Sequence, residues 1–168
     1  RTARLAAALQ ALGVGRLQTV STMLANTPEM VEAHYAVPAI NAVLNTLNTR
    51  LDAPLLAWQL NHCECAVLIT DREFAPVIAE ALRILQRDHR RTPIVIDVCD
   101  SEFTGAGDRL GAHEYEALLA AHDPLPKLDG PADEWDAIAV SYTSGTTGDP
   151  KGVVTHHRGA YLNAVCNA

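Results

Sequence analysis

Long apolar runs, cysteine and positive charge are all scarce in this sequence, and each scarcity excludes a class of protein. No window approaches the ~18 apolar residues that a membrane-spanning helix needs. Four irregularly spaced cysteines are too few for a disulfide scaffold in 168 residues, which favours a reducing compartment and so a cytoplasmic protein. Thirteen basic against 20 acidic residues give a net charge of -7, which argues against a nucleic-acid-binding protein.

Lysine is the rarest of the basic side chains. Only Lys127 and Lys151 are lysines among the 13 basic residues, because the sequence uses arginine almost everywhere else. A lysine that falls inside a distinctive motif is therefore informative about function.

The periodicity of the apolar residues predicts an α/β fold. Helical spacing alternates with short apolar runs of strand length, a pattern that is typical of a mostly parallel sheet covered by helices on both faces. The predicted helices cover residues 2–13, 28–37, 52–63, 74–85 and 113–121, and a last one passes through Tyr161 and Val165. The predicted strands cover residues 19–24, 66–70, 94–98, 137–142 and 153–154.

Three positions carry signals for helix ends. Gly13 is a natural cap at the C-terminus of the first helix. Thr27, followed by Pro28, predicts a hydroxyl cap at the start of the second helix, and Asp52 opens the third.

The segment from Thr143 to Lys151 carries the clearest chemistry. Four hydroxyls, two glycines and one lysine occupy nine positions between two apolar strands. Glycines let backbone N–H groups approach oxyanions, hydroxyls donate further hydrogen bonds, and a lysine adds a compact positive charge. The composition therefore predicts a phosphate-binding loop.

Common nucleotide and nucleophile motifs do not match this segment. A Walker A loop requires four residues between its glycine and Gly-Lys, followed by a helix. Here only two residues lie between Gly145 and Gly148, and a strand is predicted after Lys151. Tyr142 and Thr146 occupy the glycine positions that a nucleophile elbow around Ser144 would need.

The sequence Tyr142-Thr-Ser-Gly-Thr-Thr-Gly-Asp-Pro-Lys-Gly-Val153 resembles the phosphate-loop signature of the adenylate-forming superfamily, which includes the acyl-CoA synthetases. Residues 25–34, 44–51 and 156–163 also resemble segments of fatty-acyl and related acyl-CoA synthetases, so the resemblance covers nearly the whole chain. One departure is Ala25, where a proline usually precedes the asparagine.

The resemblance implies an enzyme that joins a carboxylate to ATP with Mg²⁺, releases pyrophosphate and passes the acyl group to coenzyme A. The implied phosphate-binding residues are Thr143, Ser144, Gly145, Thr146, Thr147, Gly148 and Lys151, with Lys151 stabilising the phosphate charge. His157 corresponds to a histidine near the acyl pocket of the family. The alternative is that His157 caps or buttresses the final helix.

The resemblance also implies that residues 1–168 are an incomplete N-terminal AMP-binding domain without the C-terminal subdomain. The first residue is not Met, and Ala168 follows a helix-like stretch without a stop signal, so we expect truncation at both ends. The fragment alone should be inactive.

The alternatives to an acyl-CoA synthetase are an adenylation domain that loads a carrier-protein thiol, a non-catalytic nucleotide-binding fragment, and a phosphotransferase with an unusual loop. Neither the class of acid nor the oligomeric state follows from the sequence.

The His62-Cys-Glu-Cys65 segment is a weak candidate for a metal site. Ligands packed within four residues cannot all close one tetrahedral centre, and no second pair lies nearby in the sequence. We therefore expect no metal site. The resemblance to acyl-CoA synthetases, which carry small residues at the two cysteine positions, implies a simple packing role for these side chains.

Overall fold

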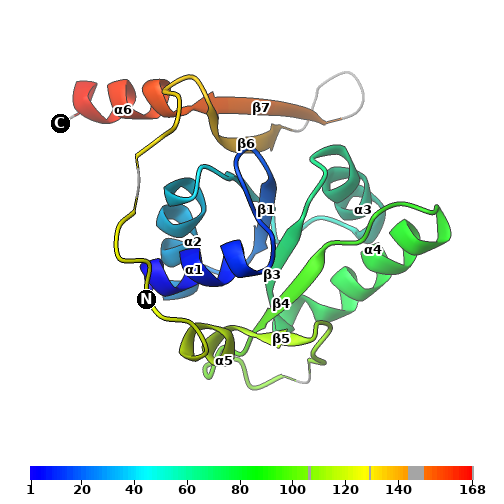
Figure 1. The fold of residues 1–168 in the computed structure, drawn as a ribbon. Helices are drawn as coiled ribbons and strands as arrows, with labels where there is room; N and C mark the ends of the chain where they lie inside the picture. Colours follow the sequence, from blue (N-terminus) through cyan, green and yellow to red (C-terminus); the bar gives the residue numbers. More distant parts are fainter. Residues whose placement is uncertain (106, 129, 144–149, 168) are drawn as a thin grey trace.

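The computed structural model describes residues 1–105, 107–128, 130–143 and 150–167. Its centre is a seven-stranded sheet in the order β5-β4-β3-β1-β2-β6-β7. The strands are β1 Thr19–Met23, β2 Val43–Thr46, β3 Val67–Asp71, β4 Ile94–Val98, β5 His113–Glu114, β6 Ala137–Thr143 and β7 Lys151–His156. The α-helices are α1 Thr2–Ala11, α2 Pro28–Ala39, α3 Ala53–His62, α4 Ala75–Arg87, α5 Tyr115–Ala120 and α6 His157–Cys166 (Figure 1).

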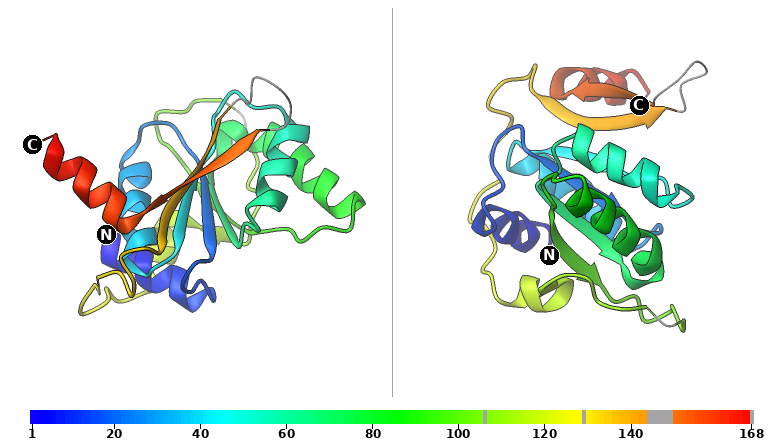
Figure 2. Two further views of the ribbon diagram at one scale, coloured as in Figure 1. Left: turned by 90° about the horizontal axis from the view of Figure 1, so that it is seen from above. Right: turned by 90° about the vertical axis from the view of Figure 1, so that its right-hand side faces the viewer.

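The sheet is parallel from β5 to β6 and antiparallel only between β6 and β7. Two apolar cores flank it. One packs α1, α2 and α5 on one face, and the other packs α3 and α4 on the opposite face. Figures 1 and 2 show these two groups of helices on opposite sides of the strands. The predicted α/β class, with a mostly parallel sheet covered on both faces, is confirmed.

The predicted helix ends are confirmed at two of three positions. Gly13 has φ 87°, and the N–H of the next residue, Val14, donates to the carbonyl of Leu9, as a Schellman motif requires. The Asp52 carboxylate accepts from the N–H of Leu55. Thr27 does stand at the N-cap position of α2, but its buried hydroxyl has no hydrogen-bond partner. The predicted hydroxyl cap is therefore wrong.

Two strands were not predicted. β2 contains Asn45, which breaks the apolar run, but its Nδ2 donates to Ser21 Oγ on β1 at 3.0 Å, so the polar group is buried with a partner. β5 has only two residues, too short for a periodic signal, and the prediction of a helix from residue 113 is wrong there, because α5 begins at Tyr115. The irregular segment between β4 and β5 is fixed to the sheet by Asp97, whose carboxylate accepts from the N–H groups of Leu110 and Gly111.

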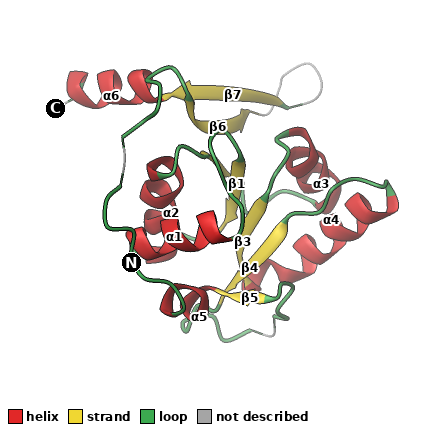
Figure 3. Cartoon of the chain, viewed as in Figure 1, coloured by secondary structure: helices red, strands yellow, loops and turns green. Residues whose placement is uncertain are grey.

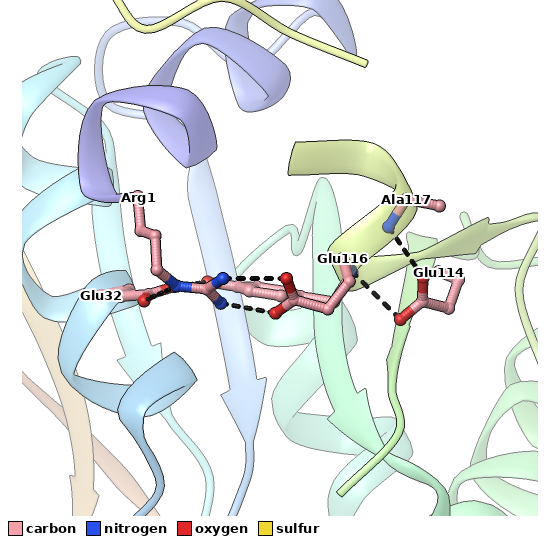
Figure 4. Close-up of polar contacts among 6 residues, drawn as sticks. Arg1, Glu32, Glu114, Glu116 and Ala117 are labelled. Atoms are coloured by element: carbon pink, nitrogen blue, oxygen red, sulfur yellow. Dashed lines mark hydrogen bonds and ion pairs between the residues drawn. The ribbon is translucent and has the colours of Figure 1, made fainter. Parts of the chain in front are cut away.

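A polar network joins the helices of one face (Figure 4). The Arg1 guanidinium on one side contacts Glu32 of α2 and on the other side forms two hydrogen bonds with Glu116 of α5. Glu114 caps α5 by accepting from the N–H groups of Glu116 and Ala117. Glu32 is buried, and its second oxygen accepts from the Tyr115 hydroxyl at 2.7 Å, so Arg1 compensates its charge and both of its oxygens have a partner.

Candidate functional site

The predicted phosphate loop connects the paired ends of β6 and β7. Thr143, the last residue of β6, pairs with Lys151, the first residue of β7, and Tyr142 pairs with Gly152. Both Thr143 and Lys151 are exposed. The antiparallel pairing therefore brings together the two ends of the motif, as expected for a loop at a strand-to-strand connection. The other predicted loop residues, Ser144, Gly145, Thr146, Thr147 and Gly148, lie outside the described residues.

Gly152 lies opposite Tyr142 in the hairpin. A Cβ at this position would lie 3.3 Å from Val140 Cγ2, which is a tight contact, and 3.5 Å from Tyr142 Cε1, which is an ordinary van der Waals contact. A side chain here would therefore press on Val140 more than on the tyrosine ring.

An aromatic cluster fixes the loop end of this hairpin to α3. The Tyr142 hydroxyl lies 2.8 Å from His62 Nδ1. Trp58, one turn earlier on α3, stacks on the His62 ring with centroids 4.7 Å apart and meets the Tyr142 ring edge-on at 5.8 Å. Burial is the main cause that raises the pKa of Tyr142, and the Cys63 thiol raises it further. The phenol therefore stays protonated as a hydrogen-bonding group.

A cavity of about 640 Å³ opens beside the hairpin. It lies where β2 and β6 end, and these two strands are parallel neighbours, so their carboxyl ends share one edge of the sheet. This edge is the usual place for ligands in open α/β sheets, and the volume is within the range of small-molecule sites. Its lining residues are Thr46, Leu47, Asn48, Leu51, Leu55, Gln59, Ser141, Tyr142, Thr143 and Pro150.

The loop after β2 forms one wall of this cavity. The Asn48 side-chain oxygen accepts from the N–H of Arg50, and the Asn48 carbonyl accepts from the N–H of Leu51, so the segment is a compact turn. Gln59 of α3 is buried and also lines the cavity. Residues 44–51 were singled out by their resemblance alone, whereas Gln59, His62 and Tyr142 were missed as site residues because their proximity depends on the tertiary fold.

His157 lies at the opposite end of β7 from Lys151. His157 comes six positions after Lys151 along extended chain, a span of roughly 20 Å. The His157 N–H donates to the Asp136 carbonyl, its Nε2 is buried without a partner, and burial lowers the pKa of its imidazole. The structure thus brings Thr143 and Lys151 together and separates His157 from both. A role for His157 in positioning substrate stays a prediction.

The histidine that caps the final helix is His156, and His157 does not cap it. His156 Nδ1 accepts from the N–H of Gly159 at 2.8 Å. Its ring packs on Trp135, over which the Arg158 guanidinium also lies, and Arg158 pairs with Glu134. These contacts hold the start of α6 against the connection that precedes β6.

Metal ligands do not gather in the part of the chain that the structure describes. Within the described ranges no three His, Cys, Asp or Glu side chains are placed to hold one ion. Cys63 and Cys65 are free thiols, as are Cys99 and Cys166. Among the described helices none is long and apolar enough to cross a membrane.

Sequence comparison finds relatives along the whole chain. Residues 1–168 match the family described as AMP-binding enzyme. The chain is 42% identical over 174 residues to the peroxisomal acetate/butyrate–CoA ligase AAE7 of Arabidopsis thaliana, a match that covers 99% of this chain and 31% of the relative. It is 40% identical to the acetate–CoA ligase CCL3 of Humulus lupulus, with 96% of this chain and 30% of the relative covered. The chain thus spans about three-tenths of the length of these relatives.

Structural comparison gives the same fold. An anthranilate CoA ligase, AuaEII, solved in complex with anthranoyl-AMP, superposes with a TM-score of 0.83 at 24% identity over 98% of this chain and 30% of that chain. A fatty acyl CoA synthetase of Mycobacterium tuberculosis superposes with a TM-score of 0.68 at 29% identity, covering 93% of this chain and 27% of its own. On the family match to all 168 residues, this chain belongs to the AMP-binding enzyme family.

Proposed function

We propose that this chain is the early part of the large N-terminal domain of an ATP-dependent acyl-CoA synthetase. The observation that carries the proposal is the β6–β7 hairpin, which holds Thr143 and Lys151 as a pair at the two ends of the phosphate-loop sequence. The identity of about 40% to enzymes named as acetate– and acetate/butyrate–CoA ligases supports the reaction class. The short coverage of those relatives supports an incomplete domain that would be inactive alone.

In the proposed reaction a carboxylate oxygen attacks the α-phosphorus of ATP, and pyrophosphate leaves to give an acyl-adenylate. The acyl group then passes to the thiol of coenzyme A. Both reactants of the first step are anions, so the site must offset their repulsion with fixed positive groups. Lys151 supplies such a group. At ~4 Å from a phosphate oxygen and an effective dielectric near 20, its attraction is roughly 4 kcal/mol before desolvation is subtracted.

The same proposal assigns Thr143 and residues 144–148 to hydrogen bonds with the β- and γ-phosphates. ATP would arrive with Mg²⁺, which would neutralise part of the phosphate charge. Carboxylates are the usual protein ligands of this ion, and the described rim of the loop, Thr143 and Lys151, contains none, so we assign no residue to the metal.

The acid is proposed as a small carboxylic acid, with a fatty acid as the first expectation. The names of the relatives include acetate, butyrate and benzoate, so a panel should span short aliphatic, longer aliphatic and aromatic acids. Several of these relatives are peroxisomal by name, so the cytoplasmic location stays a prediction that imaging of the tagged complete protein would check.

The test is product analysis of the complete protein with ATP, Mg²⁺, coenzyme A and the acid panel. AMP, pyrophosphate and an acyl-CoA are the expected products. Pyrophosphate release without acyl-CoA, followed by transfer to a carrier-protein thiol, would favour the alternative of an adenylation domain. ADP in place of AMP would show a phosphotransferase. No nucleotide turnover with any acid would leave a non-catalytic nucleotide-binding protein.

A further inference from the structure

Gln59 of α3 is a buried residue whose side-chain amide has no partner within the chain. The residue is 4% exposed, and its amide forms no hydrogen bond with any residue in the ranges that the structure describes. The buried amide of Asn45, by contrast, donates to Ser21 Oγ. Buried polar groups in folded proteins are nearly always hydrogen-bonded, so the amide of Gln59 indicates a partner that is not part of this chain.

The same residue lines a cavity. Gln59 forms part of the wall of the cavity of about 640 Å³ beside the β6–β7 hairpin, together with Leu55, which lies one turn earlier on the same face of α3. On the adjoining face, Leu56 and Leu60 are buried in the core that α3 and α4 form against the sheet. This packing prevents α3 from turning, so the position of Gln59 at the cavity is fixed.

The lining of this cavity suits a neutral part of a ligand. None of its described lining residues is charged. Leu47, Leu51 and Leu55 supply apolar surface, and Ser141 and Thr143 of β6 supply hydroxyl groups. A carboxylate or a phosphate inside the cavity would lose hydration without meeting a cation there. An aliphatic chain that bears a hydroxyl or an amide matches both kinds of surface.

We propose that Gln59 is a specificity-determining residue whose side-chain amide hydrogen-bonds to a neutral hydroxyl or amide group on an aliphatic chain bound in this cavity. The amide nitrogen donates and the amide oxygen accepts, so a group that can do both satisfies both atoms. A hydrocarbon chain of the same length would leave the amide unpaired in the complex, and sites of this kind reject the analogue that lacks the polar group. The expected effect is therefore on discrimination between ligands.

The identity of this chain rests on the proposed function. Two reactants of the proposed reaction can supply it: a carboxylic acid with a hydroxyl substituent, or coenzyme A, whose arm carries amide groups. Thr143 lies on the cavity wall and begins the phosphate loop, so the cavity adjoins the position proposed for the phosphates of ATP. Either chain would extend from there into the cavity, and the chemistry that Gln59 recognises is the same for both.

Titration calorimetry on the complete protein tests the proposal with matched pairs of probes. One pair is hydroxybutyrate and butyrate, and the other is pantetheine and butanethiol, so that each pair differs in neutral polar groups. The wild type should prefer the polar member of at least one pair, and Gln59→Leu should lose about 3- to 10-fold of that preference. The matched control is Gln86→Leu, the same substitution at an exposed position of α4, which should keep the wild-type preference.

Thermal unfolding separates this role from a structural one. Because the Gln59 amide contributes no hydrogen bond to the described part of the fold, Gln59→Leu should unfold at the wild-type temperature or above it. A clearly lower unfolding temperature would assign Gln59 to the stability of the fold and overturn the proposal. Gln59→Met keeps an unbranched side chain and removes both polar atoms, so it should show the same loss of preference without the altered shape of leucine.

The two pairs also identify the source of the chain. A change in the acid pair alone assigns the cavity to the acid, and a change in the thiol pair alone assigns it to the arm of coenzyme A. An unchanged preference in Gln59→Leu for both pairs overturns the proposal, as does an equal loss of affinity for the polar and the apolar member of a pair. Pyrophosphate release by the wild type is measured separately. If it is absent while the Gln59-dependent preference persists, the proposed function fails and the binding role of Gln59 stands.

Discussion

The sheet has two unequal parts, the inner strands β1 to β5 and the outer hairpin of β6 and β7 with α6. Every residue of β1 and β3 is buried, and α1 to α5 pack against the inner strands. In the outer part, Val154 of β7 is 62% exposed, Tyr161 of α6 is 68% exposed, and α6 has no buried residue. Figure 3 shows this outer part at one end of the molecule.

The two parts differ in what an apolar stretch of the sequence predicts. In the inner part an apolar run means burial, because the same side chains fill the two cores. In the outer part Val153 and Val154 form part of β7 and yet remain 51% and 62% exposed, so these apolar residues predict secondary structure without predicting packing. The candidate site lies in the outer part, where the fold positions Thr143 and Lys151 by backbone pairing and by one aromatic anchor instead of a packed core.

Matched leucine substitutions give the largest expected contrast. Leu56 of α3 is fully buried, and Leu162 of α6 is 46% exposed. Leu56→Ala should destabilise the chain by about 2–5 kcal/mol, because it removes buried methyl groups and leaves a cavity. Leu162→Ala should cost less than about 1 kcal/mol, since alanine favours helix and little burial is lost. Urea unfolding followed by circular dichroism measures both, and equal losses would contradict the distinction between the two parts.

Substitution of Lys151 should reverse the contrast, with a large effect on activity and a small one on stability. Lys151→Ala in the complete protein should slow pyrophosphate release by on the order of 10² to 10³, because it removes fixed positive charge at the phosphates. Lys151→Arg should recover part of the rate, since the charge returns with a different geometry. Lys127→Ala, the same substitution at the other lysine, is the control. An unchanged rate in Lys151→Ala would remove this residue from the site.

Tyrosine offers a second matched pair. The Tyr115 hydroxyl donates to the buried Glu32 carboxylate, whereas Tyr161 is exposed on α6. Tyr115→Phe should destabilise the chain by about 1–3 kcal/mol, because it leaves a carboxylate oxygen buried without its donor. Tyr161→Phe should change stability by less than about 0.5 kcal/mol. Thermal unfolding of the two variants beside the wild type tests this, and a neutral Tyr115→Phe would show that the hydrogen bond from Tyr115 to Glu32 has no net effect on stability.

Most of the inner part was predictable because its signals are local. Residues 94–98 were predicted as a strand and form β4 with the same bounds, and the left-handed conformation of Gly13 follows from its position after the first helix. The failure at β2 has a long-range cause. Asn45 looks unsuited to a buried strand until Ser21, 24 residues earlier, supplies its partner.

In the candidate site, only the residues that are contiguous in the sequence were predictable. The motif from Thr143 to Lys151 identified both residues that the structure then pairs. His62, which lies 80 residues before Tyr142 in the sequence, could not be assigned to the site, because no spacing rule connects the two. The cap of α6 could not be assigned to His156 for a similar reason, since the cap depends on the residue at which β7 ends.

The smallest expected effect concerns the ion pair that ties the inner part to the outer part. Arg16, which precedes β1, donates from Nε and Nη2 to the two carboxylate oxygens of Asp136 at 2.7 and 2.8 Å, just before β6 begins. The hydrogen bonds from Arg16 lower the pKa of Asp136 below its ordinary value of 3.8. The folded chain therefore holds this carboxylate ionised at a pH where the unfolded chain has begun to protonate it.

The pair's contribution is then complete above the ordinary pKa and is lost as the pH falls through the lowered one. The difference in melting temperature between wild type and Asp136→Asn should accordingly be constant from neutral pH to about pH 5 and should shrink below about pH 4. Arg16→Met in the Asp136→Asn background should add little, because the partner is already neutral. A difference that instead grows as the pH falls would mean that Asp136 is destabilised as an anion, and that contacts other than this pair join the hairpin to the inner sheet.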